Sequence, residues 1–102
     1  MRFIVIEKVR EGTMPQDMKE FMKLAGEDLK YKAKLQKDGK IISGGPCLDI
    51  VGDCYVLETT TIEEMGEIFF NSPINFVVSR EVHPIGTFED SLEGMKELAR
   101  KK

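Results

Sequence analysis

A short run near the end of the sequence, SREVHP (79–84), contains the residues best suited to exchange a proton. Its strand-like alternation places Glu81 and His83 on one face and Arg80 on the other. Histidine titrates near neutral pH, and a carboxylate on the same face orients the ring and raises its basicity, as a general base requires. Alternatively, His83 ends a strand at the surface or in a subunit contact, because Pro84 follows it directly.

A second acid, Glu7, interrupts the apolar run FIVIEKV on the side of Phe3 and Val5. Burial at that position would raise its pKa, which suits a general base. Alternatively, Glu7 emerges into water at the strand end, or pairs with Arg80 beside a cavity. The planar fork of an arginine binds both oxygens of a carboxylate, so Arg80 is also a candidate for anchoring an anionic ligand group.

Tyr31, Tyr55 and Met22 are candidates for contacts with a ligand. Either tyrosine hydroxyl can donate a hydrogen bond to a developing enolate oxygen; the alternative for each is a core position with a satisfied hydroxyl. Asp28 lies three residues before Tyr31, on the same side of an expected helix. The methionines of the expected helices, Met22 among them, fit either the wall of an apolar pocket or an ordinary core.

The motifs of the common cofactor and metal chemistries are missing from the sequence. One histidine and two cysteines cannot complete a four-ligand structural zinc site. No GxGxxG follows a strand, and neither GxxxxGK[ST] nor GxSxG occurs. We therefore expect neither a metal nor a cofactor. The net charge of −3 and the interspersed charges also argue against a nucleic-acid partner, and the basic run KYKAK (30–34) is expected to form a solvated helix face.

Length and composition predict a single globular domain over residues 1–102. The chain is 41% hydrophobic and 32% charged, which suits one hydrophobic core. Its apolar stretches are far shorter than the ~20 residues that span a bilayer, so no membrane contact is expected. The first residues, MRFIVIEKV, do not resemble a signal peptide. We expect a cytoplasmic location, where Cys47 and Cys54 remain thiols.

The hydrophobic pattern alternates between strand and helix periods. Thr13 and Gln16 have the spacing of a capping box, with Pro15 in the first turn of a helix that ends at Lys37-Asp38-Gly39. Thr60 or Thr61 opens a second helix, and Thr87 precedes a third. The expected strands are residues 3–9, two runs within 40–58, and 74–83. Each expected helix has an apolar inner face. These faces are assigned to Met14, Met18, Phe21, Met22, Ala25, Leu29 and Ala33 in the first helix, to Ile62, Met65, Ile68 and Phe69 in the second, and to Phe88, Leu92, Met95 and Leu98 or Ala99 in the third.

The resulting order, β-α-β-β-α-β plus a terminal helix, is the ferredoxin-like α+β arrangement. Right-handed crossovers place the two main helices on one face of an antiparallel four-stranded sheet, in which the second strand is an edge. The glycine-rich stretch GGPCLDIVGDC (44–54) is then a bulged edge strand and a turn rather than a phosphate loop, since a strand follows it. The other sheet face carries apolar residues and stays bare. We therefore predict a homodimer or a larger ring.

Three segments together resemble a known family: LQKDGKI (35–41), GDCYVLETTTIEEM (52–65) and SPINFVVSREVHPI (72–85). Their order and spacing, over roughly residues 2–85, are similar to the muconolactone isomerase-like proteins of the dimeric α/β-barrel superfamily. The resemblance implies a cofactor-free site in a pocket within the protomer, often near a subunit interface. It also implies proton transfer on small unsaturated lactones, or oxygenation of polycyclic phenols as in cousin families, and assembly into rings.

The residues and the resemblance together predict a cofactor-independent enzyme, isomerase or monooxygenase-like, that acts on a small cyclic or aromatic compound. His83 or Glu7 would transfer the proton, with Glu81 orienting His83, Arg80 anchoring an anionic group and a tyrosine assisting. The alternative is a non-catalytic module that binds a small ligand or forms oligomers on the same fold. The two hypotheses differ in whether Glu7, Arg80, Glu81 and His83 converge on one cavity.

Overall fold

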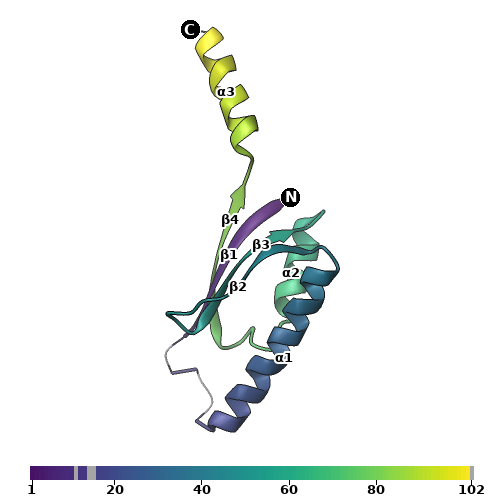
Figure 1. Ribbon diagram of the computed structural model, residues 1–102, viewed down its shortest axis with the longest axis vertical. Helices are drawn as coiled ribbons and strands as arrows, with labels where there is room; N and C mark the ends of the chain where they lie inside the picture. The colour runs from purple at the N-terminus through teal and green to yellow at the C-terminus, as the bar shows by residue number, and fades with distance from the viewer. Residues whose placement is uncertain (11, 14–15, 102) are drawn as a thin grey trace.

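The element order expected from the sequence is present in the structure (Figure 1). The computed structural model describes residues 1–10, 12–13 and 16–101. Within these residues the chain forms β1 (Arg2–Val9), α1 (Met18–Lys37), β2 (Ile41–Pro46), β3 (Gly52–Glu58), α2 (Ile62–Phe70), β4 (Val78–Ile85) and α3 (Phe88–Arg100). None of these described helices combines the length and apolarity that crossing a bilayer requires.

The strands of the described chain form one antiparallel sheet in the order β2–β3–β1–β4. β1 is therefore central, β2 and β4 are edges, and α1 and α2 lie on the same side of the sheet (Figure 1). This topology confirms the predicted ferredoxin-like α+β fold. The core lies between the sheet and these two helices and consists of Phe3, Val5, Ile41, Tyr55, Leu57 and Ile68.

The sheet register brings three charged residues level with one another. Glu7 on β1 lies directly opposite Asp53 on β3 and opposite Arg80 on β4. Residues paired across neighbouring strands share a face, so these side chains point toward α1 and α2. The strand register alone therefore places three charged side chains in a row across the sheet, at one end of the core.

The helix α1 begins later than the sequence indicated. Its N-cap is Asp17, whose side chain accepts from the Lys19 amide, whereas the Thr13 hydroxyl donates to the carbonyls of Arg10 and Val77. The predicted first-turn residues Met14 and Pro15 lie outside the described residues. At its other end the prediction is confirmed, because Gly39 has a φ of +81° directly after the C-cap Asp38.

The predicted methionine stripe on α1 does not face the core. Met18 is largely exposed and Met22 is 67% exposed. The inward row contains Asp28, Lys32 and Leu35, at the spacings of one helix face. Ion pairs made by Asp28 and Lys32 therefore fix the rotation of the helix, and the methionines are turned toward solvent.

The second half of the fold is mostly as expected. Thr61 caps α2 by accepting from the Glu64 amide, and Ile68, Met65 and Phe69 pack against the sheet, whereas Ile62 is exposed. The fourth strand begins at Val78 rather than at residue 74, because residues 72–77 form turns instead. It continues through Pro84, which an edge strand tolerates.

The hairpin between β2 and β3 is irregular on its edge side. The pairing register shifts between Ile41 and Ser43, so the bulge lies slightly before the predicted Gly44–Pro46 segment. Gly44 has a φ of +123°, and a Cβ there would lie 2.3 Å from the Cys54 carbonyl oxygen. Cys47 and Cys54, both within the described residues, are free thiols.

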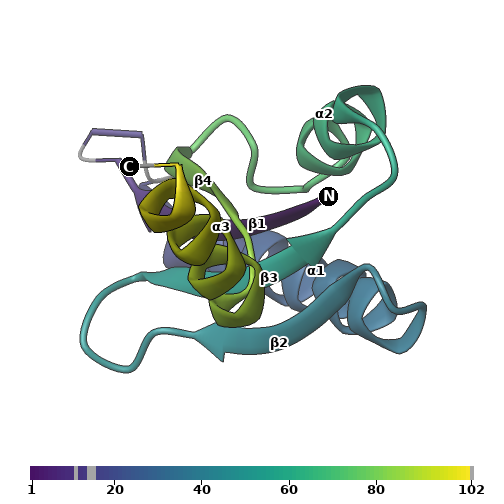
Figure 2. The same ribbon diagram turned by 90° about the horizontal axis from the view of Figure 1, so that it is seen from above.

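The terminal helix α3 extends away from the rest of the molecule beyond the end of β4 (Figure 1), and in the view from above it is seen in front of the strands (Figure 2). The molecule is accordingly elongated, with principal extents of 61 × 27 × 23 Å. None of the residues of α3 is buried, so its expected apolar side does not pack on the described part of the same chain. The sheet face opposite α1 and α2 is likewise left uncovered by the described elements, as predicted.

Candidate functional site

Five charged side chains gather between α1 and the sheet, and we call them the buried ion cluster: Glu7, Asp28, Lys32, Asp53 and Arg80. Glu7 is only 1% exposed. Its Oε1 accepts from Lys32 Nζ at 2.5 Å, and its Oε2 accepts from Arg80 Nε at 2.6 Å. Tyr55 donates its hydroxyl proton to the same Oε2 at 2.9 Å. The Glu7–Arg80 ion pair considered from the sequence is therefore present.

Lys32 holds the cluster together. Its ammonium contacts Asp28 Oδ2 at 2.6 Å and also donates to Glu7 and Asp53, so its three protons bond to three carboxylates. Burial alone would lower the pKa of Lys32, but the neighbouring carboxylates outweigh burial and raise it. The ammonium is therefore a fixed positive charge, and the prediction that the basic run is a solvated face is wrong for Lys32.

Arg80 is committed to protein partners. Besides Glu7, its Nη1 donates to Asn75 Oδ1 at 2.9 Å, and its guanidinium lies 4.2 Å from the centre of the Phe69 ring. Its buried Nη2 has no hydrogen-bond partner among the residues described. Because Glu7 occupies Nε and Arg80 is not among the residues that line the cavity between α1 and the β2–β3 hairpin, Arg80 is poorly placed to anchor an anionic ligand there.

The charges of the cluster set the pKa of Glu7. Burial raises that pKa, but Lys32 and Arg80 together lower it by more, so it lies below its usual value. The expectation of a raised pKa is therefore wrong, because two cations contact the same carboxylate. With all five groups ionised, three carboxylates face two cations, and the cluster carries one excess negative charge.

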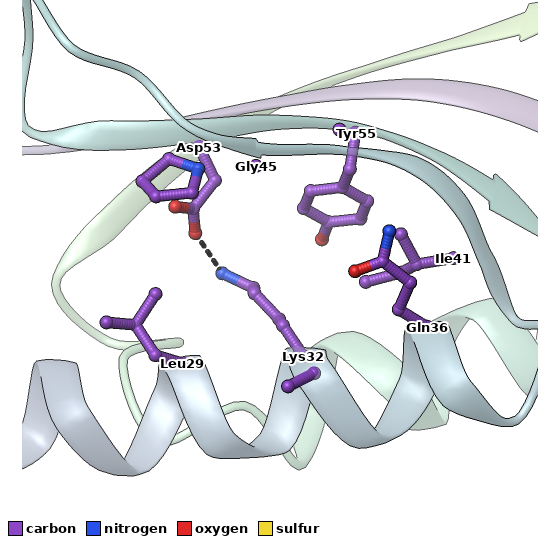
Figure 3. Close-up of a pocket in the computed structure, with 10 residues that line it drawn as sticks. Leu29, Lys32, Gln36, Ile41, Gly45, Asp53 and Tyr55 are labelled. Atoms are coloured by element: carbon purple, nitrogen blue, oxygen red, sulfur yellow. Dashed lines mark hydrogen bonds and ion pairs between the residues drawn. The ribbon is translucent and has the colours of Figure 1, made fainter.

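A cavity of about 210 Å³ opens beside the cluster, between α1 and the β2–β3 hairpin (Figure 3). Lys32 reaches across it from α1 to Asp53, while the Tyr55 ring and the Gln36 amide border its other end (Figure 3). The remaining lining is mostly apolar or backbone and comprises Leu29, Ala33, Ile41, Gly44, Gly45 and Pro46. We call this space the α1–β2 cavity.

Two features of the α1–β2 cavity bear on its chemistry. Burial, followed by the charge of Glu7, strongly raises the pKa of Tyr55, so its phenol stays protonated and donates to Glu7. Asp53 uses Oδ2 for Lys32, which leaves Oδ1 for a ligand. Asp53 also lines another cavity of about 200 Å³, whose lining includes Asp28.

The candidates on β4 divide between two faces of the sheet. Arg80 lies on the inner face with Glu7, whereas Glu81 and His83 lie on the outer face, with exposed side chains 3.4 Å apart. At 62% side-chain exposure, His83 is remote from the cavity lining. Glu7, Arg80, Glu81 and His83 therefore do not converge on one cavity, which is the arrangement predicted from the sequence for the non-catalytic module.

The remaining candidates also separate. Tyr55 lines the α1–β2 cavity, and its contact with a ligand stays a prediction. Tyr31 donates instead to the Ile68 carbonyl at 2.7 Å and so joins α1 to α2. Met22 faces solvent, outside the residues that line the cavity.

Three polar side chains of the cavity lining were not identified as site residues from the sequence: Lys32, Asp53 and Gln36. The Asp28–Lys32 spacing of four residues was a usable signal, because such a pair shares one helix face. Asp53 and Tyr55 are two residues apart on a strand, with Cys54 between them, so the sequence also indicated that they share a face. Gln36 follows Lys32 by a further four residues.

Among the residues described, Glu7, Asp28 and Asp53 are the group that meets the spacing of a metal site. Their ligand oxygens all lie within 4.8 Å of one another. Lys32 bonds to all three, so an ammonium already occupies the position that a metal ion would take. The donor set therefore fits an internal cation better than a bound metal.

Comparisons with known proteins show which solved structures share this fold. Neither the protein-family models nor the curated proteins gave a match. Among solved structures, muconolactone isomerase superposes with a TM-score of 0.74 at 16% identity, covering 85% of this chain and 90% of the other. The 5-chloro-2-hydroxyhydroquinone dehydrochlorinase of Burkholderia phenoliruptrix AC1100, in complex with 2,5-dihydroxybenzoquinone, superposes with a TM-score of 0.68 at 20% identity, covering 88% and 98%. The resemblance to the muconolactone isomerase-like fold is confirmed.

Proposed function

We propose that this chain is a cofactor-independent enzyme that transfers a proton on a small cyclic or aromatic compound bound in the α1–β2 cavity. The observation that carries the proposal is the placement of Asp53, beside the Lys32 ammonium, on the wall of an otherwise largely apolar cavity. A carboxylate beside a fixed cation in such a cavity can accept a proton while the cation balances the charge that develops on the substrate.

In this proposal, Asp53 Oδ1 takes a proton from a ring carbon next to a carbonyl group. The carbonyl oxygen gains the negative charge, which the Lys32 ammonium stabilises electrostatically and the Gln36 amide stabilises by donating a hydrogen bond. Asp53 then returns the proton to a different carbon, and the product is an isomer of the substrate. Glu7 and Tyr55 act as positioning residues, since they hold Lys32 and the cavity wall in place.

Two further observations support this class of substrate. The cavity volume of about 210 Å³ suits a single substituted ring rather than an extended ligand. The two structural neighbours are named for a lactone and for a hydroxylated chloroaromatic compound, both small oxygenated rings.

The test begins with a thermal-shift screen of lactones, hydroxylated quinones and phenols. A ligand at about 100 times its dissociation constant stabilises the protein by about 2.7 kcal/mol. Ligands that bind are then incubated with the protein in D2O, and NMR follows deuterium incorporation at ring carbons. Asp53→Asn is expected to lower the exchange rate about 10²- to 10⁴-fold. Asp49→Asn, an exposed change in the same hairpin, serves as the matched control.

The alternative function is a non-catalytic ligand-binding module. This alternative is favoured because the charged groups of the buried ion cluster already bond to one another. Lys32 and Arg80 are paired with carboxylates before any ligand binds. Ligands that stabilise the protein without deuterium exchange would support this module and contradict the proposed enzyme. Exchange that is unaffected by Asp53→Asn would retain an enzyme but reject Asp53 as its base.

A further inference from the structure

The positive charges beside the α1–β2 cavity are already bonded to protein groups. Lys32 is the cation among the lining residues, and the three protons of its ammonium bond to three carboxylates. Arg80 is not part of the lining, and its Nε and Nη1 donate to Glu7 and Asn75. Among the residues described, the cavity therefore offers a ligand no cationic donor that is still unbonded.

The polar atoms that remain on the cavity wall are mostly acceptors. Asp53 uses Oδ2 for Lys32, so its Oδ1 remains available. Tyr55 donates its hydroxyl proton to Glu7, so its oxygen keeps lone pairs that can accept. Asp53 and Tyr55 are 8% and 5% exposed, and they border the cavity together with the Gln36 amide, which can donate or accept (Figure 3). The wall therefore suits a ligand that brings its own donors.

The buried ion cluster also has one negative charge in excess, because three carboxylates face two cations. This charge borders a largely apolar space, where salt screens it less than it screens a surface charge. A carboxylate on a ligand would be repelled by the cluster, and it would leave water without gaining a cationic partner, which is costly. A ligand without negative charge incurs neither cost.

We propose that the α1–β2 cavity selects a ring compound that carries an O–H or N–H donor and no negative charge, and that Asp53 imposes this selection. The inference rests on the function proposed above and narrows its substrate class. A ring hydroxyl that donates to the Tyr55 oxygen satisfies the wall and leaves Asp53 Oδ1 free to take a proton.

The same balance of charge permits a negative charge that forms during the proposed reaction. When Asp53 takes a proton, the two carboxylates that stay ionised face two cations, and the cluster is neutral. The charge that Asp53 loses appears on the substrate oxygen, so the total charge of the site does not change. The cavity therefore excludes a ligand that arrives as an anion but accommodates an enolate that forms within it.

Three compounds that share one ring test the selection by binding alone: benzylamine, benzyl alcohol and benzoate. At neutral pH they are cationic, neutral and anionic. NMR titration of the wild type measures the three dissociation constants, and the shifted signals of Gln36 and Tyr55 verify the site. Benzylamine and benzyl alcohol are each expected to bind at least about tenfold more tightly than benzoate. Benzoate binding that is equal or tighter would overturn the selection.

Asp53→Asn tests the residue that imposes the selection. The new amide oxygen is expected to accept from Lys32, which turns the amide NH2 toward the cavity. Benzoate should then gain at least about tenfold in affinity and benzylamine should lose as much. Asp49→Asn removes the same charge from an exposed position of the hairpin and leaves the constants unchanged. Unchanged constants in a folded Asp53→Asn protein would overturn the role of Asp53.

The outcomes separate this inference from the proposed function. Circular dichroism verifies the fold of Asp53→Asn, and the wild-type ranking, which needs no variant, decides the proposal if that variant does not fold. The expected ranking without deuterium exchange on any ligand would reject the enzyme and retain the selection. Exchange on a ring carboxylate that binds as tightly as its alcohol would retain the enzyme and reject the selection. Failure of all three compounds to shift Gln36 or Tyr55 would reject both.

Discussion

Lys32 on α1 and Asp53 on β3 form an ion pair that bridges the α1–β2 cavity from helix to sheet. Lys32 also contacts Asp28 on its own helix and Glu7 on β1, so one ammonium connects three elements. The same contacts that rotate α1 against the sheet therefore also form the wall of the cavity. Stability and the proposed chemistry are consequently expected to respond together when this residue is changed.

Removing the ammonium should be strongly destabilising. Lys32→Met leaves the carboxylates of Glu7, Asp28 and Asp53 close together, with Arg80 on Glu7 as the remaining cation of the cluster. Loss of one partner from a buried ion network costs about 3–5 kcal/mol. Urea denaturation measures the change. Lys30→Met, the same substitution at an exposed position of α1, is the control; equal losses in the two variants would mean that Lys32 does not hold the cluster.

Stability should fall at low pH through Glu7. Its pKa is lowered in the folded state from a reference of 4.5, so the unfolded chain binds more protons as the pH drops. The contribution of Glu7 is fully present above that reference value and is lost as the pH falls through the lower folded pKa. The stability difference between wild type and Glu7→Gln should shrink between neutral pH and acid; a constant difference would contradict the lowered pKa.

Stability should also have an alkaline limit set by Lys32. Its pKa is raised in the folded state from a reference of 10.5, so its contribution is fully present below that value and is lost as the pH rises through the folded pKa. Urea denaturation of wild type and Lys32→Met from pH 8 upward tests this expectation. The two proteins should approach one another only above the reference pKa.

The two tyrosine hydroxyls should differ in their contributions to stability. Tyr55 donates to the buried Glu7 carboxylate, and a hydrogen bond to a charged group contributes about 1.5–3 kcal/mol. Tyr31 donates to the neutral Ile68 carbonyl, a bond worth about 0.5–1.5 kcal/mol. Tyr55→Phe should therefore cost more than Tyr31→Phe in chemical denaturation. The reverse order would place the structural role of Glu7 in doubt.

Gly52 should tolerate no side chain. A Cβ at this position would lie 1.9 Å from the backbone carbonyl oxygen of Glu7, so β1 and β3 must separate to admit it. Overpacking of this kind typically costs about 1–3 kcal/mol. Gly45→Ala is the matched control, because a Cβ there meets nothing within 4 Å. Thermal denaturation that ranks the two variants equally would contradict the close approach at Gly52.

Local signals in the sequence were sufficient for most element boundaries. Thr61, Thr87 and Gly39 act on groups within a few residues, so their capping roles were readable without knowledge of the fold. The start of α1 was misplaced because the Thr13 hydroxyl bonds to the carbonyl of Val77, a residue distant in the sequence.

The candidate site was only partly predictable for a related reason. The Glu7–Arg80 pair followed from topology, since β1 and β4 are neighbours in this fold. Lys32 was missed because exposed Lys30 and Lys34 flank it, and its three partners come from α1, β1 and β3. Its burial depends on tertiary contacts that the local pattern does not contain.

Asp53 borders both the α1–β2 cavity and the second cavity beside Asp28, and Leu29 and Pro46 also line both. The two spaces therefore share a wall that includes a charged group. A ligand that donates a hydrogen bond to that carboxylate in one cavity changes the electrostatic potential in the other. By thermodynamic linkage, the affinities of two small molecules bound in the two cavities would be coupled, and the coupling would be equal in both directions.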